Sequence, residues 1–309
     1  MTISTSISGI SGHSFHLAAR SQQASLRGEA EALQRQVATG QRLERGSDDP
    51  VAAARLRSLA RADRLAGVEA GNALRAREEL GAASARMDEM ANTLIRAREL
   101  ALLAANGATS SGGRTAIATE IAALRDTLFT LANATSATGE PLFAGHGGGP
   151  AYEKTEGGSV TYAGTGEAGE LEIGPGIAVQ RGLAGPSFLS FQHSGAPTDV
   201  FALLGALEQG LRNTRGDPGA AARDSLPGLD AALESIGRGQ TVVGTRLAWV
   251  ETVETIASQT GEARALEAAN AGGADLAATI SRLQQVMTTL EASQASYARL
   301  ASLSLFDRL

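Results

Sequence analysis

Apolar residues near the end of the chain recur with the alternating three- and four-residue spacing of a coiled coil. The pattern forms two columns, one containing Leu276, Leu283, Leu290 and Tyr297 and the other containing Ile280, Met287, Gln294 and Ala301. This spacing puts both columns on one face of a helix. Leu305 and Phe306 add apolar side chains beyond them. The pattern predicts a helix over 275–309 that must pack against another segment.

Residues 1–40 are the first candidate for that partner. Two coiled-coil patterns occur there, the first at Ile3, Ile7, Ile10 and Leu17 and the second, after a shift of phase, at Leu26, Ala30, Leu33 and Val37. Serine, glutamine and glycine interrupt the first pattern, so we expect this helix to be marginal until it packs. Gly40 provides a stop signal.

A long helix is predicted from Pro50 to about Ala105. Asp49 can cap it, and Pro50 suits the first helical position because its missing N–H is not needed there. Two heptad columns run along it, comprising Leu59, Ala66, Ala73, Leu80, Met87, Leu94 and Ala101 in one and Ala62, Ala76, Ala83, Met90, Ala97 and Ala104 in the other. At 1.5 Å per residue the helix would be roughly 80 Å long.

Further helices are predicted on both sides of a different middle segment. After a glycine-rich turn at 106–113, heptad spacing from Ile117 to about residue 137 predicts a helix that folds back on the long one. A second helical half starts after Asp199, another candidate cap, and we expect helix breaks at Pro218 and Pro227. Gly272-Gly273 would then separate this half from the terminal helix.

The segment between the two helical halves is rich in glycine and proline. Residues 139–197 contain 15 of the 37 glycines and five of the eight prolines. Short alternating runs at 159–163, 170–173 and 177–180 predict β-hairpins. The predicted fold class is therefore mainly α, a long antiparallel helical bundle or coiled coil made from both chain ends with a small inserted β-rich unit. We expect three parts: a terminal coiled coil (1–45 plus 270–309), a helical rod (46–145 plus 199–269) and the insert (146–198).

Composition limits the possible functions. Residues 1–125 carry a net charge of +3 and the remainder −9, but the arginines alternate with acidic residues and few aromatics accompany them. This pattern argues against nucleic-acid binding. The chain has no cysteine and no apolar run long enough to span a bilayer, so neither a disulfide nor a membrane partner is expected. The N-terminus lacks the pattern of a cleaved signal peptide.

The sequence gives little support for a catalytic or metal-binding site. The four histidines are scattered, and Asp48-Asp49 is better explained by helix capping than by acid–base catalysis. No nucleophile-elbow or zinc-protease motif occurs. We therefore expect no enzyme activity, no metal and no cofactor.

Several motifs recur along the chain in a recognisable combination. The main motif is ATGQRLERGSDDPVAAA at 38–54, and the others are ARELA at 97–101, GEPLFAG at 139–145, YAG at 162–164, IGPG at 173–176 and LSLFDRL at 303–309. Together they resemble the flagellar hook-associated protein 3 family, the hook–filament junction proteins of the flagellin superfamily. Flagellins usually have a Lys-Asp-Asp-Ala version of the Asp-Asp motif and a different terminus. The resemblance covers most of the chain and is weakest over 146–198.

The resemblance implies a bacterial structural subunit that leaves the cell unfolded by the flagellar type III pathway and assembles, extracellularly, at the distal end of the hook. It implies that the N- and C-terminal segments pair. Its partners would be copies of itself in a ring-like homo-oligomer, the other hook-associated junction protein on the hook side, flagellin on the filament side, and an export chaperone. The expected assembly interface consists of Leu26, Leu33, Val37, Leu276, Ile280, Leu283, Met287, Leu290, Tyr297, Leu305 and Phe306.

Two other functions remain compatible with the pattern. A short flagellin, the filament subunit, shares the same helical ends. A cytoplasmic helical signalling or binding module would share the heptads but would give no role to the glycine-rich insert.

Overall fold

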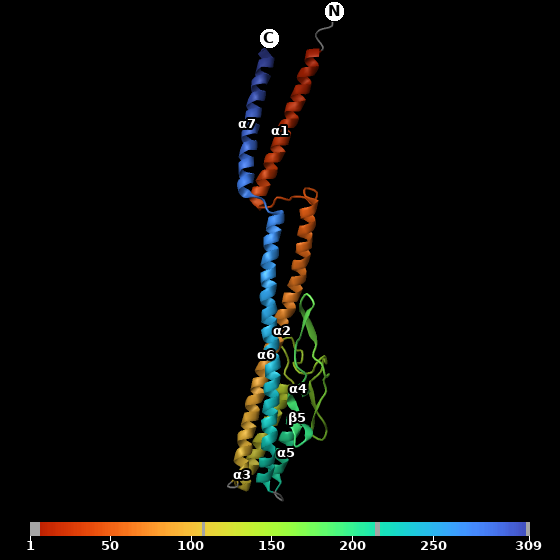
Figure 1. Cartoon of the computed structure of the whole chain (residues 1–309), viewed down its shortest axis with the longest axis vertical. Helices are drawn as coiled ribbons and strands as arrows, with labels where there is room; N and C mark the ends of the chain where they lie inside the picture. Colours follow the sequence, from red (N-terminus) through yellow and green to blue (C-terminus); the bar gives the residue numbers. More distant parts are fainter. Residues whose placement is uncertain (1–6, 107–108, 214–216, 307–309) are drawn as a thin grey trace, which may run out of the picture. The chain divides into compact units, whose positions relative to one another are not determined.

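The computed structural model describes residues 7–106, 109–213 and 217–306 (Figure 1). The helices are α1 (Ile7–Thr39), α2 (Pro50–Ala105), α3 (Ser111–Ala132), α4 (Pro186–Leu189), α5 (Val200–Arg212), α6 (Pro218–Gly272) and α7 (Leu276–Phe306). The strands are β1 (Tyr152–Lys154), β2 (Val160–Tyr162), β3 (Glu170–Gly174), β4 (Ile177–Gln180), β5 (Ser190–His193) and β6 (Ala196–Asp199). The prediction of a mainly helical fold with a small β-rich insert is confirmed.

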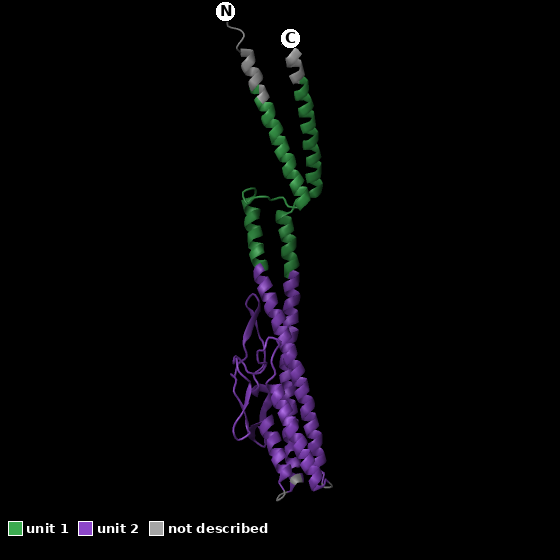
Figure 2. Ribbon diagram, turned by 180° about the vertical axis from the view of Figure 1, so that it is seen from behind, with its two compact units in different colours: residues 1–63, 260–309 green, residues 64–259 purple. Residues whose placement is uncertain are grey.

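The chain divides into two compact units (Figure 2). Unit 1 contains residues 1–63 and 260–309, and unit 2 contains residues 64–259. Both chain ends therefore belong to one unit. The three-part division expected from the sequence stays a prediction.

In unit 1, α1 and α7 pair in an antiparallel arrangement (Figure 1). As predicted, α1 ends at Thr39, and Gly40 adopts a φ of +68° that favours glycine. The break after Gly272 is also confirmed, since α7 begins again at Leu276.

Unit 2 is built on the heptad face of α2. From Ala73 to Ala104 every residue of the two predicted columns is buried, while Ala66, near the start of the unit, is partly exposed. Helix α3 folds back along α2, and Arg96 of α2 forms an ion pair with Glu120 of α3 at 2.8 Å. Helix α5 packs against α3, and the Asp199 cap accepts a hydrogen bond from Ala202 N–H at 2.8 Å. The predicted hairpin of helices is therefore confirmed.

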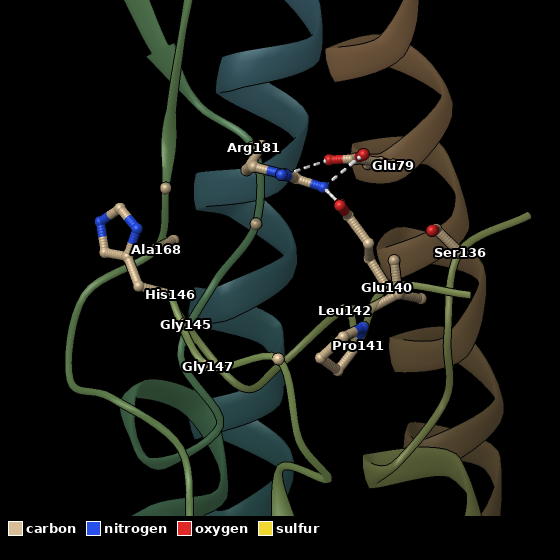
Figure 3. Close-up of a pocket in the computed structure, with 13 residues that line it drawn as sticks. Glu79, Ser136, Glu140, Pro141, Leu142, Gly145, His146, Gly147, Ala168 and Arg181 are labelled. Atoms are coloured by element: carbon tan, nitrogen blue, oxygen red, sulfur yellow. Dashed lines mark hydrogen bonds and ion pairs between the residues drawn. The ribbon is translucent and has the colours of Figure 1, made fainter. Parts of the chain in front are cut away.

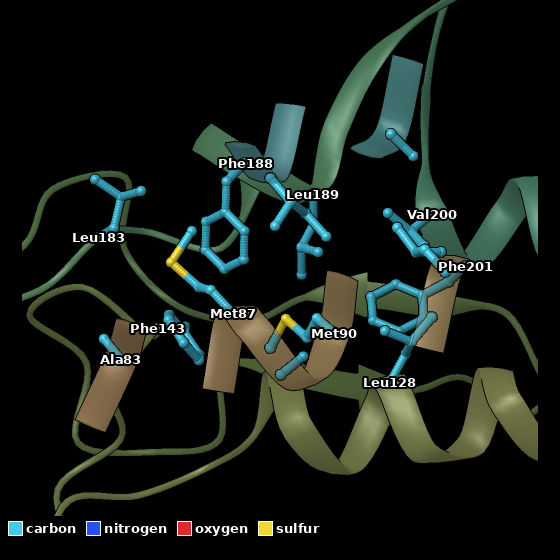
Figure 4. Packing of buried hydrophobic residues seen from close by; sticks show 14 of the residues in the cluster. Ala83, Met87, Met90, Leu128, Phe143, Leu183, Phe188, Leu189, Val200 and Phe201 are labelled. Atoms are coloured by element: carbon cyan, nitrogen blue, oxygen red, sulfur yellow. The ribbon is translucent and has the colours of Figure 1, made fainter. Parts of the chain in front are cut away.

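The larger core side chains of unit 2 come from both the helices and the insert. Met87 and Met90 of α2 are fully buried and lie among the aromatic rings of Phe143, Phe188 and Phe201 (Figure 4). The rings of Phe143 and Phe188 lie 5.1 Å apart. Because alanine dominates the helix faces, these few large side chains fill the space that the alanines leave.

The insert consists of three separate antiparallel hairpins, β1–β2, β3–β4 and β5–β6. The sequence predicted β2, β3 and β4, and Gly176 occupies the turn of β3–β4 with a φ of +69°. It missed β1, β5, β6 and the short helix α4. The missed strands contain no valine or isoleucine, whereas each of the predicted strands contains at least one.

Two predicted boundaries were wrong. Pro227 does not break the second helical half but lies inside α6, where its ring removes one backbone hydrogen bond. Leu229 and Ile236 are fully buried, and we attribute the continuity of the helix to this packing. Helix α3 ends at Ala132 rather than near residue 137, because Asn133 leaves the helical conformation.

Candidate assembly surface

The paired ends in unit 1 form the first candidate surface. On α1, Leu26, Leu33 and Val37 are half-buried and Ala30 is buried, so the second predicted pattern faces α7. At the edge of the pair, Arg282 donates to Glu29 Oε1 at 2.8 and 3.0 Å. Leu17 is 55% exposed. Ile3 and the side chains of Ile7 and Ile10 lie outside the described residues.

Helix α7 meets α1 with a different face from the predicted one. The column of Leu283, Leu290 and Tyr297 is half-buried or buried, as expected, but Leu276 is exposed. The neighbouring column on the α1 side consists of Thr279, Val286 and Ser293 instead of Ile280, Met287 and Gln294. Small side chains allow two helices to pack closely. The sequence prediction considered apolar character alone and therefore selected the bulkier column.

Bulky apolar side chains therefore remain on the other flank of α7. Leu276, Ile280 and Met287 are 47%, 42% and 38% exposed. Gln294 is also exposed, and the side chains of Ala301, Leu305 and Phe306 lie outside the described residues. Leu283 and Leu290 lie between the two flanks. The face of α7 that contacts α1 therefore continues into a second apolar face, which no described helix of unit 1 covers.

A backbone tie joins the loop after α1 to the break between α6 and α7. Arg42 N–H donates to Gly272 O at 2.8 Å, and Ala274 N–H donates to Gly40 O at 2.9 Å. The Arg42 guanidinium also donates to Ala271 O at 3.0 Å and to Asp49 Oδ2 at 3.1 Å. A side chain at Gly273 would meet Ala269 O at 2.4 Å, so glycine is required there. The tie holds together two segments 229 residues apart in sequence.

The two aspartates of the loop have separate structural roles. Asp48 Oδ2 accepts backbone N–H bonds from Glu44 and Arg45, which closes the turn. Asp49 precedes Pro50, and its Oδ1 accepts Ala52 N–H at 3.0 Å, the geometry of a helix cap. The pKa of Asp49 is lowered, first by the hydrogen bond from Ala52 and then by the one from Arg42.

Two motifs that carried the family resemblance, at 139–145 and 162–164, meet where the insert begins. Tyr162 Oη donates to Thr165 O at 2.6 Å and Phe143 O at 3.2 Å, and Thr165 N–H donates to Ala144 O at 2.9 Å. Gly145 and Gly164 lie at this crossing, where an added Cβ would come within 2.4 and 2.5 Å of backbone oxygens. The glycines are thus required by close packing of the backbone.

A small polar cleft of about 160 Å³ lies between α2 and the insert (Figure 3). Arg181 from the end of β4 donates to both oxygens of Glu79 at 2.7 Å and also pairs with Glu140. Glu79 is 5% exposed. Because Arg181 binds both carboxylates, the cleft is explained as an attachment of the insert to α2. No cluster of three metal-ligating residues occurs in the described parts of the chain.

This architecture can be compared with that of known proteins. The sequence profile described as the bacterial flagellin N-terminal helical region matches residues 10–147. Flagellar hook-associated protein 3 of Escherichia coli (strain K12) is 27% identical over 288 residues, which cover 88% of this chain and 90% of the relative. Residues 10–147 are therefore similar to the N-terminal helical region of bacterial flagellins, and most of the chain is similar to flagellar hook-associated protein 3. The predicted resemblance is confirmed, and the similarity indicates a structural component of the bacterial flagellum.

Two further comparisons show how far the similarity extends. A solved structure of a flagellar hook-associated protein from Vibrio parahaemolyticus shares the fold, with a TM-score of 0.68, 20% identity, and coverage of 73% of this chain and 100% of that one. Flagellin B of Vibrio cholerae serotype O1 (strain ATCC 39541) is 35% identical, but over only 102 residues, or 33% of this chain and 25% of the relative. Among the described helices, none has both the length and the apolar composition to cross a membrane.

Proposed function

We propose that this chain, which is similar to flagellar hook-associated protein 3, is a non-enzymatic adaptor that joins the flagellar hook to the filament. The observation that supports this most is the extent of the match to Escherichia coli flagellar hook-associated protein 3, which covers about nine-tenths of both chains. The match to flagellin B covers a third of this chain. A junction subunit is therefore favoured over a short flagellin.

The proposed mechanism is self-association through the helical ends. In unit 1, α1 covers one flank of the Leu283–Leu290 column, and the other flank carries the exposed side chains of Ile280 and Met287. Fully burying a side chain of this size contributes about 1.5–3 kcal/mol. A helix from a second copy that packs there would bury them, so the interface predicted at Leu276, Ile280 and Met287 serves the contact between copies.

The proposed partners follow from this position. Copies of the chain form a ring-like homo-oligomer, the other hook-associated protein contacts it on the hook side, and flagellin contacts it on the filament side. We propose export by the flagellar type III pathway to the extracellular end of the hook. An export chaperone would cover the apolar flank of α7 before assembly, because an exposed face of this kind favours premature association.

A complementation experiment tests the proposal. A deletion strain of the source bacterium receives the wild-type gene, a gene lacking codons 276–309, the double variant Ile280→Asp/Met287→Asp, or the control Ala292→Asp. Ala292 is exposed on the other side of α7, so its variant adds a charge without touching the apolar flank. We expect wild type and control to restore filaments. The truncated and double variants should give hooks without filaments and free flagellin in the medium.

Each alternative outcome has a distinct meaning. Normal filaments on the truncated strain would contradict the adaptor function itself. Normal filaments on the double variant alone would contradict the role of the apolar flank. A deletion strain with neither filaments nor any flagellin in the medium would identify the chain as a flagellin. Labelled antibody on isolated flagella should stain the hook end rather than the filament length.

A further inference from the structure

In unit 2, helix α2 presents an uncovered face with an apolar centre and basic ends. Leu65 and Val68 are 57% and 62% exposed, and Arg64 and Arg75 are exposed beside them. Neither arginine forms an ion pair with a described residue, although Arg77, close by, pairs with Glu254 at 2.8 Å. We call Arg64, Leu65, Val68 and Arg75 the basic face.

The insert has the opposite charge. All five of its glutamates, Glu153, Glu156, Glu167, Glu170 and Glu172, are exposed and form no ion pair within the described residues. Its two cations are already paired with other elements: Lys154 contacts Asp126 of α3 at 2.8 Å, and Arg181 contacts Glu79 of α2. The outer surface of the insert is therefore acidic, and no described cation pairs with its glutamates.

The hairpin β3–β4 concentrates this charge on one side. Leu171 is half-buried and Ile173 and Val179 are buried, which turns the alternate residues Glu170, Glu172 and Ala178 to solvent. The hairpin is fixed beside α2 of its own copy, where Asn72 Nδ2 donates to Glu172 O at 2.8 Å. Nevertheless, neither glutamate forms an ion pair with a described residue, so both remain available for a cation from another chain. We call Glu170, Glu172 and Ala178 the acidic face.

We infer that the basic face of α2 docks on the acidic face of β3–β4 in a second copy of this chain. The inference rests on the self-association proposed above and assigns it a second contact, within unit 2. Charge complementarity selects the partner, because the chain itself carries both unpaired faces and each is uncovered. The two faces are different surfaces, so the contact is heterologous. Contacts of this type build rings or helical arrays rather than closed dimers.

Crosslinking of full-length protein tests the geometry, since the chain contains no cysteine. Val68→Cys and Ala178→Cys are prepared as separate variants and mixed, and a short bis-maleimide is added. We expect covalent dimers in the mixture at low salt and few in either variant alone. The control pairs Val68→Cys with Thr241→Cys, an exposed position on α6. At about 1 M salt, where screening acts within about 3 Å, the dimer yield should fall at least about tenfold.

Charge reversal tests whether the basic face and the acidic face recognise each other through their charges. Arg64→Glu/Arg75→Glu and Glu170→Arg/Glu172→Arg, each combined with the cysteine variants, should both lower the dimer yield about tenfold or more, because like charges then face each other. Combining all four reversals should restore it. Reversing the exposed pair Glu234–Arg238 should change nothing.

The outcomes separate this inference from the adaptor function. Crosslinks of Val68→Cys to itself would show a different, symmetric contact, and no crosslinks in the low-salt mixture would overturn the inference. Loss of assembly only with the arginine reversals would identify an acidic partner other than this chain. If the reversals leave filaments normal in the complementation strain, the docking inference fails while the adaptor function stands.

Discussion

The ion pair between Glu79 and Arg181 should stabilise unit 2 strongly. Glu79 is 5% exposed, and Arg181, 102 residues away, donates to both of its oxygens. Removing one member of a buried pair costs about 3–5 kcal/mol. Arg181 keeps Glu140 and its side chain is 27% exposed, so we reduce the expected cost to about 2–3 kcal/mol. For a unit of this size that lowers the midpoint of thermal unfolding by about 4–12 °C.

The assay is thermal and urea unfolding of Glu79→Gln and of the cycle formed with Arg181→Met. Circular dichroism follows the helices, and the fluorescence of Trp249, on α6 in unit 2, reports that unit. Glu234→Gln is the control, because it removes a pair whose side chains are 74% and 60% exposed and should cost at most about 0.5 kcal/mol. A loss for Glu79→Gln no larger than that of the control would refute the reasoning.

Three further predictions concern the glycine crossing, the Asp49 cap and the α1–α7 pair. Gly164→Ala should destabilise unit 2 by about 1–3 kcal/mol, since its Cβ would lie 2.5 Å from Ala144 O, whereas Gly166→Ala, which points into open space, should have little effect in calorimetry. Because the pKa of Asp49 is lowered in the folded state, its stabilisation is complete above the ordinary value near 3.9 and is lost as the pH falls through the lower folded value. The stability difference between wild type and Asp49→Asn should therefore shrink below about pH 4, and a constant difference from pH 6 to 3 would contradict this. Val286→Asp should separate α1 from α7, because Val286 is 2% exposed, and increased hydrogen exchange in both helices, absent in Ala292→Asp, would show it.

The sequence predicted those parts of the fold that depend on short-range periodicity. The columns of α2 could be identified because alanine, leucine and methionine recur at heptad positions over more than 40 residues. The stops at Gly40 and Gly272 carry strong local signals. Pro227 misled the prediction because a proline is a local signal, whereas the burial of Leu229 and Ile236 is a tertiary effect.

Other parts could not be predicted because they join distant residues. Arg42 and Ala271 are 229 residues apart, and Glu79 and Arg181 are 102 residues apart. Nothing in the local sequence distinguishes Arg42 or Arg181 from the other arginines, most of which lie on solvated helix faces. The glycines at 145 and 164 belonged to recognisable motifs, but only the structure shows that each is required by a backbone oxygen close by.

The face that α7 turns toward α1 differs from the one that the sequence predicted, and this difference bears on the proposed function. If α7 needed only to pair with α1, its most apolar face would be expected to point at α1. Instead, Thr279, Val286 and Ser293 point there, and the larger side chains of Ile280 and Met287 stay exposed on the next flank. A monomer gains nothing from that arrangement, because exposed apolar area favours aggregation. In the self-association proposed above, one helix would contact two partners, because Leu283 and Leu290 contribute to both flanks. The column that the sequence placed in the intramolecular seam is therefore the part of α7 most suited to contacts between copies.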